Sequence, residues 1–184
     1  IRKFHKKILS LDDLLRRETF TEEVYRFIKD IVAARMNILI SGATSTGKTT
    51  LLNAFCSFVN PNQRMVVVED TAELFIEHKH CVRMEGRLAN IEGKGAIRLR
   101  ELTMLCLHLR PDRIIVGEVR GDEAFFMLQA LNTGHEGSMS TIHANSVYEA
   151  LWRLESLVLM FSPNISSLVA RRMVIGGIDV MVNM

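Results

Sequence analysis

The chain has 184 residues, of which 48% are hydrophobic and 24% charged, and this fits one globular domain with a buried core. Its formal net charge of +2 at pH 7 is too close to neutral to indicate nucleic acid or a membrane surface as the main partner. No apolar run approaches the roughly 20 residues of a membrane-spanning helix. The three cysteines form no C-x-x-C pair, so a reducing cytoplasm fits better than a disulfide framework.

The N-terminal part is predicted to contain two helices ahead of the first buried strand. Residues 1–8 are basic and alternate in polarity, which is typical of an edge strand or a linker. Ser10 is a suitable N-cap for a short helix that begins at Leu11. A second helix is predicted over 21–34, because apolar residues recur there at helical spacing. Its predicted apolar face consists of Val24, Phe27, Ile28 and Ile31.

The segment 42–49, GATSTGKT, fits the phosphate-loop pattern G-x-x-x-x-G-K-[ST] at every required position. It lies between an apolar run over 36–41, typical of a buried strand, and a helical pattern over 50–59. In such a loop the backbone N–H groups hold phosphate oxygens, while Lys48 supplies a positive charge and Thr49 a hydroxyl for Mg²⁺. The sequence therefore predicts a nucleotide site. Its residues are Gly42, Ala43, Thr44, Ser45, Thr46, Gly47, Lys48, Thr49 and Thr50.

Acidic residues follow the next predicted strand, which covers 64–69. Glu69, Asp70 and Glu73 lie at its end or directly after it. Because ligands of parallel α/β sheets lie beyond the carboxyl ends of the strands, this cluster is a candidate for positioning a metal ion or water. A turn exposed to water is the alternative interpretation.

A further acidic strand end lies at Glu118. A short strand over 81–84, a polar loop over 86–95 and a helix over 96–110 are predicted before it. The apolar run that leads into Glu118 is typical of a Walker B strand, whose acid acts on Mg²⁺ or on the attacking water. Glu118 is therefore the candidate general base or metal ligand.

Helices and strands continue to alternate up to the C-terminus. A helix over 122–132 precedes a strand over 137–143, which is flanked by His135 and His143. Both histidines are candidates for sensing the γ-phosphate or contacting a neighbouring subunit, with capping and loop hydrogen bonds as the alternative. Further helices are predicted over 146–160 and 162–173, followed by an apolar run over 178–182. This alternation predicts a mainly parallel α/β sheet flanked by helices.

Four motifs in this order resemble the ATPases of bacterial and archaeal secretion and pilus systems. They are GATSTGKTTLLNAF, VVVEDTAEL, the stretch over 90–124 that contains GEVRG, and LQALNTGHEGSMSTIHANS. The last three resemble the Asp, Walker B and His boxes of those enzymes, and the match is closest to the CpaF/TadA-like pilus-assembly branch. One difference is Ser45-Thr46, where those ATPases usually have Gly-Ser.

The resemblance implies a RecA-like P-loop NTPase domain over 10–184, with residues 1–9 as the end of an N-terminal domain or linker. It also implies a homohexamer that hydrolyses ATP with Mg²⁺ at the cytoplasmic face of the inner membrane, next to a membrane platform protein. In such enzymes the glutamates of the Asp and Walker B boxes serve the water and the metal.

Carried onto this sequence, those catalytic roles fall to Glu73 and Glu118, with Lys48 on the phosphates. Thr49 and Glu118 are the expected Mg²⁺ ligands, with Glu69 or Asp70 as further candidates. Arginines commonly reach the γ-phosphate in these ATPases. The candidates here, which the sequence does not rank, are Arg83, Arg98, Arg100 and Arg110.

The sequence thus predicts an ATP-hydrolysing motor for pilus assembly or protein secretion, with no nucleic acid as partner. A VirB11-like ATPase of conjugation or type IV secretion shares every motif and is one alternative. Another is a nucleotide-binding module that gates assembly without turnover.

Overall fold

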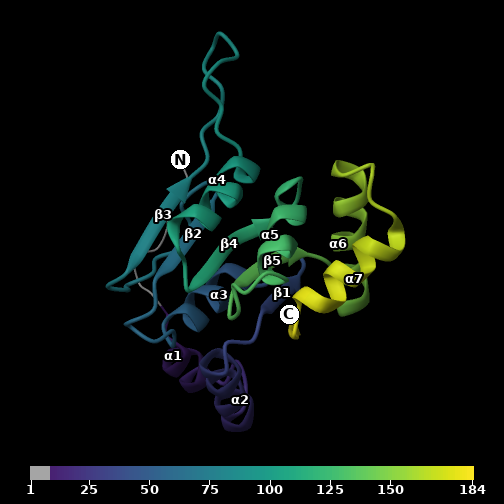
Figure 1. Cartoon of the computed structure of the whole chain (residues 1–184). Coiled ribbons are helices and arrows are strands. Elements are labelled where there is room, and N and C mark those ends of the chain that lie inside the picture. The colour runs from purple at the N-terminus through teal and green to yellow at the C-terminus, as the bar shows by residue number, and fades with distance from the viewer. Residues whose placement is uncertain (1–8) are drawn as a thin grey trace.

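The chain folds around a six-stranded sheet in which every neighbouring pair of strands is parallel (Figure 1). The computed structural model describes residues 9–184, so the edge strand or linker expected over 1–8 lies outside the described residues. The strand order is β3-β2-β4-β5-β1-β6. The strands are β1 (Ile38–Gly42), β2 (Met65–Glu69), β3 (Cys81–Glu85), β4 (Arg113–Val119), β5 (Met139–His143) and β6 (Val180–Asn183). The predicted α/β class with a mainly parallel sheet is confirmed.

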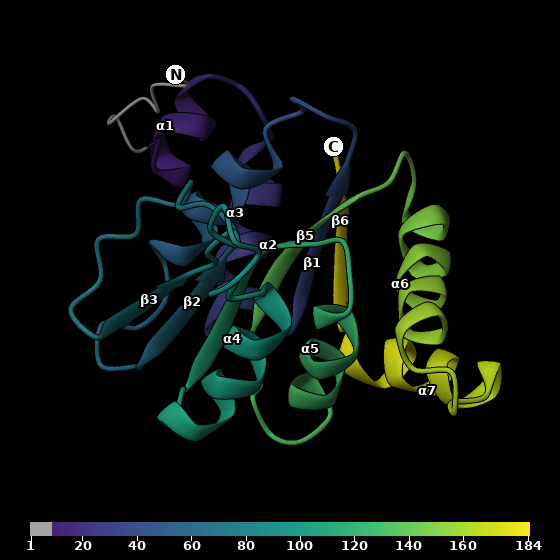
Figure 2. The same cartoon turned by 90° about the horizontal axis from the view of Figure 1, so that it is seen from above.

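Helices cover both faces of the sheet (Figure 2). One face carries α1 (Leu11–Arg16), α2 (Glu22–Ala33) and α3 (Lys48–Cys56). The other carries α4 (Leu99–Cys106), which the short 3-10 helix η1 (Leu107–Leu109) extends, and α5 (Glu123–Leu131), α6 (Val147–Phe161) and α7 (Ser167–Gly177). In β2, Val66 and Val68 face the second layer while Met65 and Val67 face the first. Burial on both faces explains why the strands read as continuous apolar runs.

Both N-terminal helices begin where the sequence predicts. Ser10 Oγ accepts a hydrogen bond from the Asp13 N–H at 3.1 Å, and the Asp13 carboxylate accepts one from the Ser10 N–H at 3.1 Å. This reciprocal capping box fixes the start of α1. Thr21 caps α2 by a single hydrogen bond, in which its hydroxyl oxygen accepts from the Val24 N–H at 3.4 Å.

The apolar face of α2 is rotated from the predicted one. Val24 and Phe27 were expected to be buried and are 42% and 54% exposed. Ile28 and Ile31 are buried as predicted, and Val32, which was not predicted, completes the buried face. Spacing alone gives a stripe of apolar residues, and the neighbouring layer decides which part of it is buried.

Two helices on the other face begin later than predicted. Helix α4 begins at Leu99 rather than at 96, because Arg87 and Ile97 exchange backbone hydrogen bonds of 2.9 and 2.8 Å and hold the preceding chain extended. Helix α7 begins at Ser167, capped by Ser166, rather than in the region of 162.

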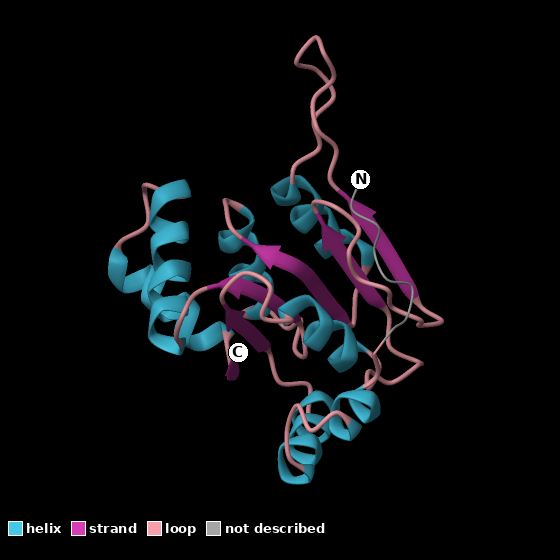
Figure 3. Cartoon of the chain, turned by 180° about the vertical axis from the view of Figure 1, so that it is seen from behind, coloured by secondary structure: helices cyan, strands magenta, loops and turns pink. Residues whose placement is uncertain are grey.

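Residues 86–97 form an arm that projects beyond the sheet (Figure 3). Residues 86–95 of the arm were predicted as a polar loop, whereas 96 and 97 were predicted to begin a helix. Apart from the Arg87–Ile97 pair, the arm has no ladder of its own within the described chain. Its side chains Leu88 and Ile91 are fully in solvent.

A buried arginine ties the amino ends of the strands together. Arg113 is 1% exposed and donates to Val32 O at 2.7 Å, Gly137 O at 3.1 Å and Gln63 Oε1 at 2.8 Å. Burial lowers the pKa of this guanidinium to about 10. These bonds connect α2, β4 and the approach to β5 at the edge of the sheet opposite the carboxyl ends.

Over residues 9–184, no helix is both long and apolar enough to cross a bilayer.

Candidate active site

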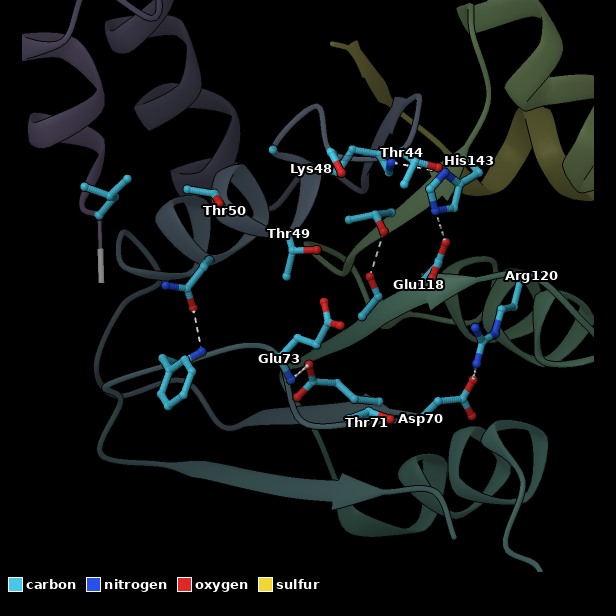
Figure 4. Close-up of a pocket in the computed structure, with 18 of the residues that line it drawn as sticks. Thr44, Lys48, Thr49, Thr50, Asp70, Thr71, Glu73, Glu118, Arg120 and His143 are labelled. Carbon is cyan, nitrogen blue, oxygen red and sulfur yellow. Dashed lines mark hydrogen bonds and ion pairs between the residues drawn. The ribbon is translucent and has the colours of Figure 1, made fainter. Parts of the chain in front are cut away.

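The phosphate loop and both acidic strand ends open into one cavity of about 1000 Å³ at the carboxyl ends of the strands (Figure 4). Strands β1, β2, β4 and β5 all end at this cavity. Its volume lies at the upper end of the ~300–1,000 Å³ that small-molecule sites occupy. The topology therefore brings together motifs that lie as far apart in sequence as Thr44 and His143.

The phosphate loop has the backbone that close approach to an anion requires. Gly47 has φ +99°, in the left-handed region that favours glycine, and α3 begins directly after it. A Cβ at Gly42 would lie 2.6 Å from Thr46 Oγ1, so a larger residue there would displace the loop. The loop thus presents its N–H groups at the N-terminus of a nine-residue helix. Such a terminus is suited to hold phosphate.

Ser45 also has a left-handed backbone, with φ +65°. An L-residue in this conformation costs about 1–2 kcal/mol relative to the right-handed one. Ser45 is the position where the sequence differs from the glycine usual in the related ATPases. The difference therefore falls where the backbone favours glycine.

Lys48 turns back onto the loop that carries it. Its ammonium donates to Gly42 O at 2.9 Å and Ala43 O at 2.7 Å, and lies 3.3 Å from His143 Nδ1. Lys48 is 7% exposed, and burial lowers the pKa of the ammonium, against the opposing charge of Glu118. The Lys48 ammonium therefore lies next to the N–H groups of the phosphate loop. It donates to loop carbonyl oxygens at the positions where phosphate oxygens would accept.

His143 connects Lys48 to Glu118. Its Nε2 lies 2.7 Å from Glu118 Oε1, and its Nδ1 faces the Lys48 ammonium. An ammonium has only donors, so Nδ1 accepts from it and the ring proton sits on Nε2, where it is donated to the carboxylate. The side chains Lys48, His143 and Glu118 therefore form one hydrogen-bonded row across the end of the cavity.

The acidic cluster after β2 divides into different roles. Glu69 is 5% exposed, and its Oε1 accepts from the N–H groups of Glu73 and Leu74, each at 2.9 Å. Burial raises the pKa of this carboxyl, and the two N–H bonds oppose the shift. Asp70 is ion-paired with Arg120. As a result, Glu69 is engaged in holding the turn 69–74 and Asp70 in a salt bridge, although both line the cavity.

Glu73 and Thr49 both line the cavity. Figure 4 shows Thr49 and Glu73 directed toward each other from opposite walls, with Glu118 at the side of the same space. A hydroxyl and two carboxylates are oxygen ligands of the kind that Mg²⁺ prefers.

The two histidines lie at opposite ends of β5. His143 is its last residue and lines the cavity, whereas His135 precedes the strand and its Nδ1 lies 3.2 Å from Ala130 O. The structure therefore places only His143 at this site. This difference could have been predicted from the sequence. A residue before a parallel strand lies at the edge of the sheet away from the carboxyl ends, where ligands bind, so His135 is on the wrong side of β5.

None of the four arginines proposed from the sequence is among the described residues that line the cavity. Arg83 contacts Glu69 and Leu74 O beneath the turn, and Arg100 pairs with Asp122 at 3.7 Å. Arg17 and Arg120 line the cavity instead. Arg120 had a signal in the sequence, because it lies two residues after Glu118 in GEVRG, whereas nothing local marked Arg17 at the end of α1.

The sequence and the fold were compared with known proteins. Residues 1–175 match the type II/IV secretion system protein family. The chain belongs to this family. It is 51% identical over 130 residues to a putative conjugal transfer protein of Mycobacterium tuberculosis, covering 71% of this chain and 37% of that protein. It is 39% identical over 160 residues to the conjugal transfer protein TrbB of Rhizobium radiobacter, covering 85% and 47%.

The fold is also similar to that of a solved secretion ATPase. The VirB11 ATPase of the Brucella suis type IV secretion system superposes with a TM-score of 0.77 and 26% identity, over 100% of this chain and 55% of that one. This secretion ATPase of the same family confirms the predicted RecA-like fold and the predicted superfamily. The chain spans about half the length, or less, of the relatives it matches. The comparisons support the superfamily and leave the CpaF/TadA-like branch a prediction.

Proposed function

We propose that this cavity binds ATP with Mg²⁺ and hydrolyses it, and that the family member containing this domain uses the energy to drive pilus assembly or protein secretion across the cell envelope. The row Lys48–His143–Glu118 carries the proposal, because it joins the phosphate-loop cation to the Walker B acid on one wall of the cavity. The Brucella VirB11 structure was determined in complex with sulphate, which supports an anion site in this fold.

Each residue has a role that follows from its position. Lys48 exchanges its loop carbonyls for the β- and γ-phosphate oxygens, and the N–H groups over 43–50 hold the rest of the phosphate chain. Glu118 accepts the proton of the attacking water, and His143 holds its carboxylate by the hydrogen bond from Nε2. Glu73 faces the same space and orients that water.

The residues present fit a Mg²⁺ ion. Thr49, Glu118 and Glu73 bring a hydroxyl and two carboxylates to one cavity. Glu69 is bonded to the Leu74 N–H and Asp70 is ion-paired with Arg120. When bound with the nucleotide, Mg²⁺ neutralises the charge that develops on the phosphate oxygens.

The partners of the motor follow from the family. We infer a homohexamer at the cytoplasmic face of the inner membrane, next to a membrane platform protein, with no nucleic acid partner. Relatives carry the names of conjugal transfer proteins, so a VirB11-like conjugation or type IV secretion motor is the second candidate. Deletion of the gene, followed by assays of surface pili and of plasmid transfer, separates the two.

Calorimetry with ATP and a phosphate-release assay test the proposed reaction. The parent chain is expected to bind ATP, and Lys48→Ala to lose at least about 10-fold in affinity because the cation that faces the phosphates is gone. Unchanged affinity in Lys48→Ala contradicts the phosphate-loop assignment. ATP binding without phosphate release, in the full-length ring as well, identifies the third candidate, a gating module without turnover.

A further inference from the structure

The cavity is longer than a phosphate chain needs. Beyond the phosphate loop and the acids, it is lined by Asn53 of α3, by Phe75, and by Leu9 and Arg17, which flank α1. Because α1 and Leu9 pack in the same core as α3, Leu9 and Arg17 reach the cavity from the side of α3. Asn53 lies one helical turn beyond Thr49 and Thr50, on the same face of α3. Asn53 Oδ1 accepts a hydrogen bond from the Phe75 N–H at 3.0 Å, so Phe75 lies at this far end as well.

The other end of the cavity is occupied by charge. Figure 4 shows His143, Glu118 and the Arg120–Asp70 pair on the side away from Thr50. The acid proposed to act on the attacking water is there, so the terminal phosphate of a nucleotide points to this end. The nucleoside then has to leave the phosphate loop past Thr50, toward Asn53 and Phe75.

The far end has the chemistry that a nucleobase requires. Among the described residues that line the cavity, only Leu9 and Phe75 have large apolar side chains. Phe75 is bonded to Asn53 of α3, and Leu9 packs against the core that α1 and α3 share. Arg17 adds a guanidinium, which stacks on aromatic rings and makes no ion pair within residues 9–184. Every base has a π-face that an aromatic ring can bind.

We propose that Leu9, Arg17, Asn53 and Phe75 form the nucleoside subsite, with the base stacked on the Phe75 ring and covered by Arg17 and Leu9 from the side of α1. This inference rests on the proposed function, since it places the remainder of the same nucleotide.

Both walls of the subsite are fixed to α3. The Phe75 backbone is held by Asn53, and its neighbour Leu74 is fully buried with its N–H bonded to Glu69 at 2.9 Å. On the other side, Leu11 and Leu14 of α1 belong to the same core as Leu51, Leu52 and Phe55 of α3. The space between the walls is therefore preformed, and a preformed site reduces the entropy lost on binding.

The experiment compares ATP with inorganic tripolyphosphate, which has the phosphates and no nucleoside. Phe75→Ala is expected to weaken ATP binding about 10-fold, the size of a lost base–aromatic stack, and to leave tripolyphosphate binding unchanged. Phe75→Tyr keeps the ring and is expected to keep ATP affinity within about 2-fold. Arg17→Gln is expected to weaken ATP binding and not tripolyphosphate binding. Phe27→Ala, an exposed phenylalanine on α2, is the control that changes neither.

The outcomes separate the subsite from the proposed function. If Phe75→Ala binds ATP as tightly as the parent, or loses ATP and tripolyphosphate equally, the base does not stack on Phe75 and the subsite is wrong. An equal loss of both ligands in Arg17→Gln would move Arg17 to the phosphates and remove it from the subsite. If the parent chain binds neither ligand, the proposed function itself fails. Near-ultraviolet circular dichroism of each variant shows whether it is folded.

Discussion

At the scale of single residues, the phosphate loop carries a serine where its backbone favours glycine. Ser45 has φ +65° and an exposed side chain, so its Cβ adds strain without adding packing. We predict that Ser45→Gly stabilises the chain by about 0.5–1 kcal/mol, less than the full left-handed cost because glycine also gives the unfolded chain more freedom. Urea unfolding measures the change. Ser45→Ala, which removes the hydroxyl and keeps the Cβ, is the matched control and should show no gain.

Glu118 is the residue on which turnover depends most. We predict that Glu118→Gln binds ATP like the parent and releases phosphate at least about 100-fold more slowly, because an amide keeps the shape and cannot take a proton from water. The amide oxygen still accepts from His143 Nε2, so the row from Lys48 stays in place. Phosphate release is measured against Glu136→Gln, an exposed acid that does not line the cavity. Parental turnover in Glu118→Gln would make Glu118 a structural residue.

Residues whose role follows from a local pattern were predictable, and those that depend on the fold were not. Lys48, Thr49 and Glu118 are marked by the phosphate loop and by the apolar run before the acid, and all of them line the cavity. Phe75 and Arg17 belong to no motif. They reach the cavity because Phe75 is bonded to Asn53 and because α1 packs on α3.

At the scale of elements, the turn 69–74 depends on one buried carboxylate. Glu69 Oε1 accepts from the N–H groups of both Glu73 and Leu74, each at 2.9 Å. We predict that Glu69→Ala destabilises the chain by about 2–4 kcal/mol, because two backbone donors lose their partner and a void remains. Glu69→Gln retains the acceptor and should stay within about 1 kcal/mol of the parent. Equal losses in the two variants, measured by urea unfolding, would contradict this role.

The same residue gives a pH dependence. Burial raises the pKa of Glu69 above its usual value of 4.5, so the folded chain holds this proton more tightly than the unfolded chain. Its contribution to stability is then fully present below the unfolded pKa and is lost as pH rises through the folded pKa. We predict that the stability of Glu69→Gln relative to the parent increases as the pH rises from the usual glutamate pKa through the raised pKa of Glu69 in the folded chain. Urea unfolding at several pH values measures it, and a constant difference would contradict it.

Strands were predicted more accurately than their order or the helix starts. The inner strands β1, β2 and β4 are short apolar runs, because both faces of the sheet are covered, and this signal is local. The placement of β1 between β5 and β6 depends on pairings between residues about a hundred or more positions apart, which no run of sequence displays. Helix α7 began later than predicted because Ser166 rather than Ser162 supplies the cap.

At the scale of the whole molecule, the described residues of the cavity lack one component of a phosphoryl-transfer site, a free arginine for the γ-phosphate. Arginines that reach the γ-phosphate stabilise the charge of the transition state. Of the two arginines among the described residues that line the cavity, Arg120 is paired with Asp70, and Arg17 is at the end we assign to the nucleoside. The relatives that the chain matches are about twice its length or more. An additional segment or a neighbouring subunit is therefore the natural source of the missing cation.

We accordingly predict that the 184-residue chain binds ATP, hydrolyses it slowly and is mainly monomeric at about micromolar concentration. A longer chain that carries the additional length of the relatives should hydrolyse ATP roughly 1,000-fold faster, which is the effect of supplying an arginine to the γ-phosphate. Ring formation and turnover should rise together, because one interface would complete the site and join the subunits. Light scattering and phosphate release on both chains measure the two properties. A 184-residue chain that is already hexameric and fully active would contradict this prediction. Its own residues would then supply the arginine at the γ-phosphate, with Arg120 released from Asp70.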